Sequence, residues 1–221
     1  SQTWDDHDRS GRYVCRDFGL NYLQTVPEDG VIYTCGDNDT FPLWYTQDVE
    51  GKRTDARVCN LSYLQTDWYI DQMRRPAYDS PALPITWSRL EYCAGTNEYV
   101  YVKPNFKRSI QELYNAYPEE AKSLFGENPF ELENILKYWV RNNINEQQRS
   151  VIQMLVGPGQ STKVIPTDTV YVTIDKEAVK RSGMMMASDS IPDRMEISLR
   201  GKSALYKGDL MMLEIVAQTK W

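Results

Sequence analysis

The sequence predicts an α/β fold with a mainly parallel, Rossmann-like three-layer sheet and a helical insertion in the middle of the chain. Strand-like apolar runs alternate with helical periodicity in the first and last thirds of the 221 residues, whereas the middle is broken by prolines and then turns helical. Such alternation is typical of parallel strands joined by crossover helices. We therefore expect one soluble α/β domain over 1–221, made of a first βαβ part (1–76), an insertion with short strands and helices (77–160) and a returning α/β part (161–221).

The first part opens with a short β-branched and aromatic run at 31–33, which is typical of a buried strand. A polar turn follows at 36–40, and helical periodicity starts at Phe41. Asp39 or Thr40 can cap this helix, and Pro42 is tolerated in its first turn because its missing N–H would have no partner there. The segment predicts half of a βαβ unit.

The other elements are expected from the same kinds of pattern. A helix precedes the first strand at about 10–24, and a second strand with its helix follows at 56–61 and 66–75. Further along the chain we expect strands at 85–87, 98–102, 169–174 and 195–199, and helices at 106–117, from Asn128, at 146–155, after Asp175 and from Asp209.

Polar side chains gather where the first two predicted strands end, and in open α/β sheets ligands bind at that edge. We therefore predict a ligand-binding rim there. Its members are Asp37, Asn38, Asp39 and Thr40 after the first strand, and Asn60 and Asp67 after the second.

Three interpretations of the 37–39 stretch remain open. A D-x-D after a strand can hold a divalent metal, since hard cations prefer carboxylate oxygens. A haloacid-dehalogenase-type phosphatase motif requires D-x-D-x-T, and Thr40 comes one residue too early. Asp and Asn are also ordinary turn residues, and a carboxylate at a helix N-terminus is favourable by itself. We assign no catalytic residue and no metal ligand, and we expect no cofactor unless Asp37 and Asp39 bind a divalent metal.

The run at 5–9 contains the only histidine of the chain, which rules out a multi-histidine metal site. The run either leads into a helix in solvent or folds back onto the rim. In the second case its polar residues would join the ligand-binding set: Asp5, Asp6, His7 and Arg9.

Composition excludes some classes of protein. A net charge of −6 argues against nucleic acid as a partner. No apolar run approaches the ~20 residues needed to cross a bilayer, and we expect a fragment or mature domain without a signal peptide. The four cysteines form no C-x-x-C pair, which argues against zinc and leaves their disulfide state open: Cys15, Cys35, Cys59 and Cys93.

Two smaller patterns have competing interpretations. Tyr99 and Tyr101, with Trp87, could stack on a sugar ring, although alternating aromatics in a strand usually fill a core or an edge. The glycine-rich stretch at 157–163 lacks the residue order of a phosphate-binding P-loop.

Four longer stretches carry a family resemblance: WDDHDRSGRY (4–13), GDNDTFPLWY (36–45), NLSYLQTDWYIDQM (60–73) and KGDLMMLEIVAQTKW (207–221). They resemble the bacterial membrane proteins grouped as domain of unknown function 2723. The resemblance extends from about 4 to 73 and returns over the last third of the chain.

The resemblance implies a larger parent with a multi-span membrane portion. That portion is similar to glycosyltransferases that take sugar from a polyprenyl-phosphate donor, with an animal relative that is an endoplasmic-reticulum protein O-mannosyltransferase. The catalytic carboxylate is expected in a loop of the membrane portion that this chain does not match. By this resemblance the chain is the extracytoplasmic, periplasmic part, its partner is the membrane-embedded portion, and no role carries over to Asp37 or Asp39.

The sequence thus leaves three hypotheses of function. The favoured one is a module that binds or positions an acceptor protein or glycan. The second is a separate metal-dependent enzyme for phosphoryl or glycosyl transfer that uses Asp37 and Asp39. The third is a structural subunit whose tyrosines and tryptophans contact a membrane partner.

Overall fold

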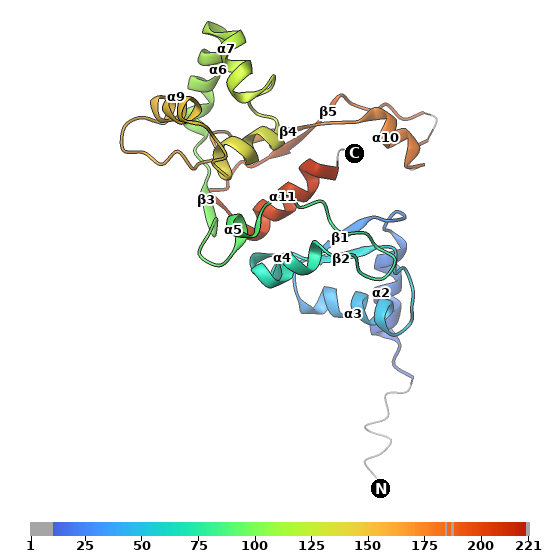
Figure 1. Cartoon of the computed structure of the whole chain (residues 1–221). Coiled ribbons are helices and arrows are strands. Elements are labelled where there is room, and N and C mark those ends of the chain that lie inside the picture. The colour runs from blue at the N-terminus through green and yellow to red at the C-terminus, as the bar shows by residue number, and fades with distance from the viewer. Residues whose placement is uncertain (1–10, 184, 187, 220–221) are drawn as a thin grey trace. The chain divides into compact units, whose positions relative to one another are not determined.

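The computed structural model of the chain describes residues 11–183, 185–186 and 188–219. These residues divide into two compact units, which are described separately here. Unit 1 contains residues 11–63 and 71–83, and unit 2 contains residues 64–70 and 84–219. Figure 1 shows the elements of both units with their labels.

The predicted Rossmann-like three-layer sheet is wrong. The strands of the described part of the chain form three separate two-stranded sheets. Only the pair of β1 (Val31–Thr34) and β2 (Arg57–Asn60) is parallel. The other two pairs are antiparallel: β3 (Tyr99–Tyr101) with β6 (Ala204–Tyr206), and β4 (Thr169–Thr173) with β5 (Arg194–Ser198). Hydrophobic periodicity locates strands along the chain but does not encode which strands pair, and pairing is what defines the fold class.

Unit 1 is built on the βαβ arrangement that the sequence predicted. β1 and β2 pair from Val31 opposite Arg57 to Thr34 opposite Asn60, and α3 (Asp37–Asp48) connects them. A preceding helix, α2 (Val14–Gln24), packs against α3. The core of this unit is small and apolar, formed by Leu23, Val26, Leu43, Ala56 and Val58.

The packing of α2 on α3 depends on a glycine. Gly19 is buried in α2, and a Cβ built at this position would overlap the carbonyl oxygen of Pro42 and the hydroxyl of Thr46. Pro42 lies inside α3, where its carbonyl accepts a hydrogen bond of 2.8 Å from the Thr46 hydroxyl. The absence of a side chain at Gly19 therefore lets the two helix backbones approach closely.

A buried arginine in β2 forms hydrogen bonds with the backbone at residues 72–75 of the same unit. Arg57 of β2 is only 3% exposed. Its guanidinium donates to the carbonyl oxygens of Gln72, Met73 and Arg75 at 3.1, 3.4 and 2.7 Å, at the end of α4 (Asp67–Met73). A charged donor that satisfies several orphan carbonyls at a helix end is stabilising, because those groups have no intrahelical partner.

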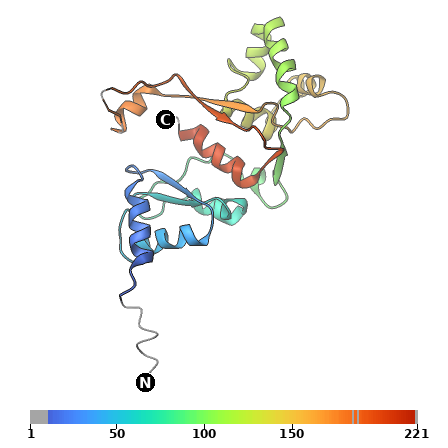
Figure 2. The same cartoon turned by 180° about the vertical axis from the view of Figure 1, so that it is seen from behind.

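Unit 2 contains mostly helices. Its apolar interior includes Trp87, Tyr92, Leu136, Trp139, Ile152 and Leu210. A short helix, η1 (Tyr63–Gln65), lies at the boundary between the units. The helices after it in unit 2 are α5 (Arg89–Tyr92), η2 (Pro104–Phe106), α6 (Lys107–Ala116), α7 (Pro118–Phe125), α8 (Leu132–Asn134), η3 (Ile135–Val140), α9 (Glu146–Val156), α10 (Lys176–Arg181) and α11 (Lys207–Thr219). Figure 2 shows β4 and β5 as a long hairpin that carries α10 at its far end.

Several expected elements of unit 2 are present with different bounds. The helix expected from Asn128 begins at Leu132, because Asn128 closes a turn by accepting the N–H of Phe130 at 3.0 Å. Asp175 caps α10 as expected, since its carboxylate accepts the N–H groups of Glu177 and Ala178, both at 3.0 Å. The sequence analysis missed α5, α7 and β6.

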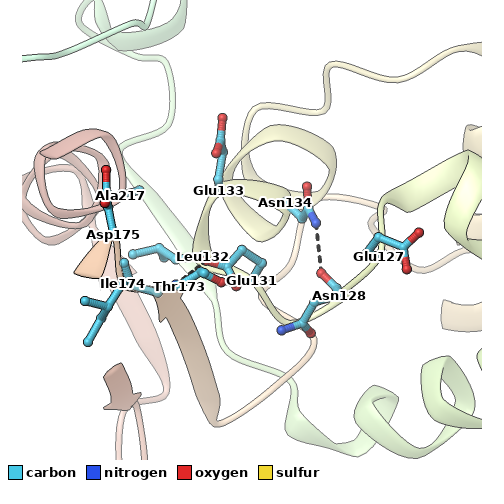
Figure 3. A pocket seen from close by; sticks show the side chains of 11 residues that line it. Glu127, Asn128, Glu131, Leu132, Glu133, Asn134, Thr173, Ile174, Asp175 and Ala217 are labelled. Carbon is cyan, nitrogen blue, oxygen red and sulfur yellow. Dashed lines mark hydrogen bonds between the residues drawn. The ribbon is translucent and has the colours of Figure 1, made fainter. Parts of the chain in front are cut away.

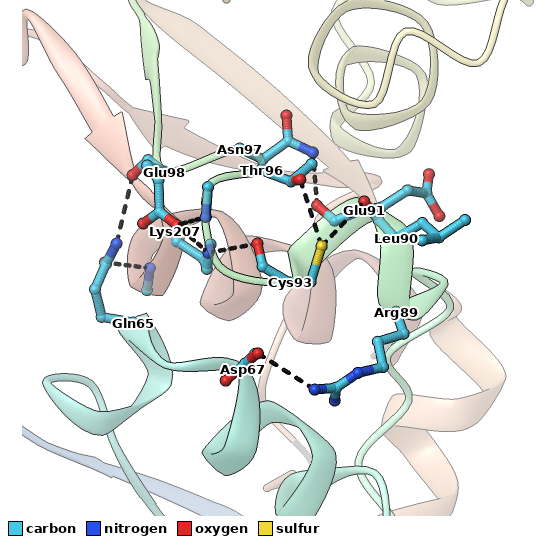
Figure 4. Close-up of polar contacts among 12 residues, drawn as sticks. Gln65, Asp67, Arg89, Leu90, Glu91, Cys93, Thr96, Asn97, Glu98 and Lys207 are labelled. Atoms are coloured by element: carbon cyan, nitrogen blue, oxygen red, sulfur yellow. Dashed lines mark hydrogen bonds and ion pairs between the residues drawn. The ribbon is translucent and has the colours of Figure 1, made fainter.

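The β3–β6 pair is anchored by an ion pair between a buried lysine and a partly exposed glutamate. Lys207, which follows β6, is 1% exposed, and its ammonium lies 2.6 Å from the carboxylate of Glu98, which precedes β3. The pKa of Glu98 is lowered, first by this hydrogen bond. Gln65 joins the cluster by donating to the Glu98 carbonyl and accepting the N–H of Gly208 (Figure 4). The cluster fixes the register of the two strands at one end.

Replacing Gly19 with alanine tests the close approach of α2 and α3. An exposed Gly→Ala change inside a helix should stabilise it by about 1 kcal/mol. Here we expect the free energy of unfolding, measured by urea denaturation, to fall by roughly 1–3 kcal/mol because the new methyl overlaps backbone atoms. Gly11→Ala is the control, since a Cβ there meets nothing within 4 Å. Stabilisation by Gly19→Ala would show that the helices do not pack this way.

Candidate functional site

Several residues of the predicted ligand-binding rim in unit 1 are engaged in hydrogen bonds within the chain. The Thr40 hydroxyl lies 2.7 Å from that of Thr34, and it accepts the amide of Asn60 at 2.8 Å. These three side chains are buried. The side-chain oxygen of Asn60, Oδ1, accepts the N–H groups of Ser62 and Tyr63 at 2.8 and 3.1 Å. The structure therefore brings the ends of β1 and β2 together, and their buried polar side chains bond to one another.

Asp39 also acts locally. Helix α3 begins at Asp37 rather than Phe41, so the predicted turn is the first turn of the helix. The two carboxylate oxygens of Asp39 accept the N–H groups of Cys35 and Gly36 at 2.8 and 2.9 Å. These bonds, that from Cys35 first, lower the pKa of Asp39. This is one half of a capping box: the Asp39 carboxylate satisfies N–H groups before the helix, while Gly36 at the N-cap has no side chain to accept a bond in return.

The remaining predicted site residues are dispersed. Asp37 is exposed and accepts the Tyr63 hydroxyl at 3.0 Å, and Asn38 is exposed beside it. Asp67 belongs to unit 2, where it pairs with Arg89 at 3.3 Å. Four others lie outside the described residues: Asp5, Asp6, His7 and Arg9. In the part of the chain that the structure describes, no three Asp, Glu, His or Cys side chains are grouped to hold a metal ion.

The cysteines are free thiols in different surroundings. Cys59 is buried in β2, and burial raises the pKa of its thiol to about 12. Cys15 and Cys35 are exposed and Cys93 is partly buried, and no disulfide joins any of the four.

The most open concentration of aromatic side chains in unit 2 lies on the β3–β6 pair. Tyr99 and Tyr101 are 52% and 50% exposed, and Tyr206, opposite Tyr99, is 60% exposed. Val100 and Leu205 on the other side of the ribbon are each 2% exposed. Because side chains alternate between the two faces of a strand, the inner face packs on the core and the outer face presents the three tyrosines. We call Tyr99, Tyr101 and Tyr206 the tyrosine face.

The hydroxyl groups of the tyrosine face lie close to one another. The rings of Tyr99 and Tyr101 meet edge to face, with centroids 5.3 Å apart. The pKa of Tyr101 is raised, first by a hydrogen bond with Tyr99 and further by the nearby Tyr206. The face thus combines exposed ring carbon with a cluster of polar hydroxyls, which is typical of amphipathic contact surfaces.

A pocket of about 520 Å³ adjoins this face at Tyr101. Two backbone hydrogen bonds of 2.8 Å connect its lining residues Tyr101 and Lys103 to Ile165: Ile165 N–H to the Tyr101 carbonyl, and Lys103 N–H to the Ile165 carbonyl. We call this cavity the Tyr101 pocket. It is lined by Tyr101, Lys103, Asn105, Phe106, Val156, Gln160, Ser161 and Val164.

Two amide side chains of the Tyr101 pocket are unused, whereas the Ser161 hydroxyl is bonded to the Lys163 backbone. The amides of Asn105 and Gln160 have no side-chain hydrogen-bond partner among the described residues, and Asn105 and Gln160 are exposed. The ammonium of Lys103 lies 5.6 Å from the centroid of the Tyr101 ring. Unlike the bonded cluster of Thr34, Thr40 and Asn60 in unit 1, this site keeps donors and acceptors available for a ligand.

A second pocket of about 400 Å³ is acidic (Figure 3). Glu131 is engaged by the N–H and hydroxyl of Thr173 at 2.7 and 3.0 Å, and Asp175 caps α10. The carboxylates of Glu127, Glu133 and Asp175 are spread apart in Figure 3 and do not converge on one point. This pocket is therefore a weaker candidate than the Tyr101 pocket.

Sequence reasoning found part of the Tyr101 site. It noted Tyr99 and Tyr101 but grouped them with Trp87, which is fully buried. It missed Tyr206, Lys103 and Phe106. The loop at 157–163, which lacks the residue order of a P-loop, contributes Gln160 and Ser161 to the pocket. The alternating Tyr-Val-Tyr pattern was the only local signal, because the other residues come together only through the fold.

The described structure is thus a mixed helical protein with short sheets and one open aromatic site. A family model described as TMEM260-associated domain 2 matches residues 15–221, and the chain belongs to this family. TMEM260 is a eukaryotic family related to protein O-mannosyltransferases. The family assignment replaces the resemblance to domain of unknown function 2723, and the label of a bacterial periplasmic domain falls with it.

No curated protein and no solved structure matches the chain. Among the described residues, no helix is both long enough and apolar enough to cross a membrane.

The capping role of Asp39 predicts a pH-dependent effect of Asp39→Asn. Because the pKa of Asp39 is lowered in the folded state, its stabilising contribution is present above its ordinary value of 3.8 and is lost as pH falls through the lowered value. We expect the variant to lose about 1 kcal/mol of unfolding free energy at pH 7. Urea denaturation at pH 7 and near pH 3 should show the difference shrinking in acid. Asn38→Ala is the matched neighbour, and an equal loss there would contradict the capping role.

The metal interpretation of Asp37 and Asp39 makes a separate prediction. Their carboxylates accept hydrogen bonds from Tyr63 and from backbone N–H groups, so binding Mg²⁺ or Mn²⁺ would require breaking the cap that Asp39 forms at the start of α3. We expect millimolar Mg²⁺ or Mn²⁺ to leave the melting temperature unchanged. A concentration-dependent rise that Asp37→Asn abolishes would restore the metal site, since a ligand bound only by the folded state raises its stability.

Proposed function

We propose that this chain is a binding module that positions a glycan, or a glycosylated acceptor protein, for a membrane-embedded glycosyltransferase-like partner. The observation that carries the proposal is the tyrosine face beside the polar Tyr101 pocket. The same proposal places the chain next to this membrane partner, on the extracytoplasmic side of the membrane. The relation of the TMEM260 family to protein O-mannosyltransferases supports it.

The chemistry of the site matches a sugar ring. One face of a pyranose consists of C–H groups, which pack favourably on the electron-rich face of an aromatic ring. Its hydroxyls need donors and acceptors at the rim, which the amides of Asn105 and Gln160 can supply. Apolar rings with a few convergent polar groups are the usual composition of a small-molecule site.

The energetics also favour binding at this place. Tyrosine loses little conformational entropy on contact because it has only two side-chain torsions, and these rings already stand on a paired ribbon. The inner face of that ribbon is held by buried Val100 and Leu205. A ligand that lands on the tyrosine face therefore meets a preorganised surface, which reduces the cost of binding.

A purely structural contact with another protein is the second candidate. Exposed tyrosines are enriched in protein interfaces as well as in sugar sites. The adjoining pocket with unused amides distinguishes the two, because a flat protein contact does not require a cavity of about 520 Å³. The metal-dependent enzyme is less favoured because Asp39 accepts the N–H groups of Cys35 and Gly36 and Asp37 accepts the Tyr63 hydroxyl.

Alanine substitution in the tyrosine face tests the proposal. Tyr99→Ala and Tyr101→Ala should each weaken binding of oligosaccharides about tenfold, since one stacked aromatic contributes about 1 kcal/mol or somewhat more. Binding can be measured by glycan-array screening followed by calorimetry on the best ligand. Tyr117→Ala is the matched control, because Tyr117 is 60% exposed at the junction of α6 and α7, away from the ribbon.

The same experiment separates the two candidates. Loss of glycan binding in Tyr99→Ala and Tyr101→Ala, with Tyr117→Ala unchanged, supports the glycan module. No binding to any glycan by the folded wild-type chain would overturn it and leave the structural contact.

A further inference from the structure

We infer that the Tyr101 pocket selects sugars that carry an anionic group, a carboxylate or a phosphate, and that Lys103 is the residue that recognises this charge. The inference rests on the proposed glycan-binding function and adds the chemical class of the ligand. It is carried by the charge content of the cavity, the lack of a partner for Lys103 and the fixed position of its backbone.

The charge of the cavity lining is one-sided. Lys103 is the only charged residue among those that line the Tyr101 pocket, and the rest are aromatic, amide, hydroxyl or aliphatic. The chain as a whole carries a net charge of −6, so the charge beside this cavity is opposite in sign to that of the whole chain. A ligand entering this pocket meets one positive group and no negative one.

Lys103 is also uncommitted, unlike neighbouring cations. Lys107 pairs with Asp168 at 3.5 Å, and Arg108 pairs with Glu112 at 2.8 Å. Among the described residues Lys103 makes no ion pair, and its ammonium lies over the ring of Tyr101. An ammonium over an aromatic face keeps its donors free toward solvent, so it can still bind an anion.

The backbone of Lys103 is held in place on both sides. Its N–H donates to the Ile165 carbonyl at 2.8 Å, and its carbonyl accepts the Phe106 N–H at 3.2 Å. Residue 103 therefore connects β3 to η2 at a defined point beside the pocket. Only the side-chain torsions must be ordered on binding, which limits the entropic cost of using this lysine.

The expected size of the effect follows from the exposure of the site. Lys103 is exposed, so its pairing with an anion is weakened by water and salt. We therefore expect a preference of about two- to fivefold for an anionic sugar over its neutral counterpart at low ionic strength. The preference should shrink toward unity at about 1 M salt, where the Debye length is only about 3 Å.

The experiment uses three matched ligands and the whole chain. A neutral hexose disaccharide is compared with the same disaccharide ending in a hexuronate and with its 6-phosphorylated form, by calorimetry at low and high salt. The test variant is Lys103→Gln, which keeps the length and polarity of the side chain without its charge. The control is Lys180→Gln on α10, at a lysine that pairs with Glu177 outside the Tyr101 pocket.

The inference is supported if both anionic ligands bind more tightly than the neutral one, and if Lys103→Gln removes this preference while leaving neutral binding intact. A preference for only one of the two assigns the anion as carboxylate or phosphate. Equal binding of neutral and anionic sugars, or a preference that survives in Lys103→Gln, overturns it. Inorganic phosphate that competes as well as the phosphosugar would also overturn it, because the site would then recognise a bare anion.

The two levels of proposal fail in different ways. If neutral sugars bind and Tyr101→Ala weakens them, but charge has no effect, only the selectivity is wrong. If no sugar binds the wild-type chain, the glycan function itself is wrong.

Discussion

The ion pair between buried Lys207 and partly exposed Glu98 is the interaction on which the candidate site depends. Lys207 is almost fully removed from water, so its ammonium requires a compensating charge, and Glu98 supplies it at 2.6 Å. These residues adjoin the ends of β6 and β3, which are more than 100 positions apart in sequence. The pair and the Gln65 bonds around it fix one register of the ribbon. That register puts Tyr99 opposite Tyr206 and sends both outward while Val100 and Leu205 enter the core.

The two polar clusters show how satisfaction of hydrogen bonds separates scaffold from site. In unit 1, Thr34, Thr40 and Asn60 are buried and bonded to one another, and Asp39 caps a helix. Such a network rigidifies the fold but leaves little for a ligand. In unit 2, Asn105 and Gln160 line a cavity with their amides unpaired among the described residues. The acidic stretch at 37–39 is therefore engaged mainly within the chain, whereas the amides of Asn105 and Gln160 are available to a ligand.

Local signals predicted local structure well. The run at 31–33, the parallel partner strand and the cap at Asp175 are present because each depends on neighbouring residues: β-branched side chains, a short connection and a side chain that reaches the next turn. The global fold class was wrong because pairing is a long-range property. Helix α10 sits at the tip of the β4–β5 hairpin, so strand–helix–strand order there accompanies an antiparallel pair rather than a crossover. Tyr99 and Tyr101 were noticed, but their outward orientation could not be read without Leu205 beneath them.

The sequence alone determined the composition, the net negative charge, the positions of most helices and strands, and the presence of alternating tyrosines near position 100. These follow from residue type and short-range periodicity. Only the tertiary structure decided that Asp39 binds its own backbone, that β3 pairs with β6, and that Lys103 and Gln160 line one cavity. The physical reason is that burial and hydrogen-bond partners are set by distant segments, whose contacts no local pattern specifies.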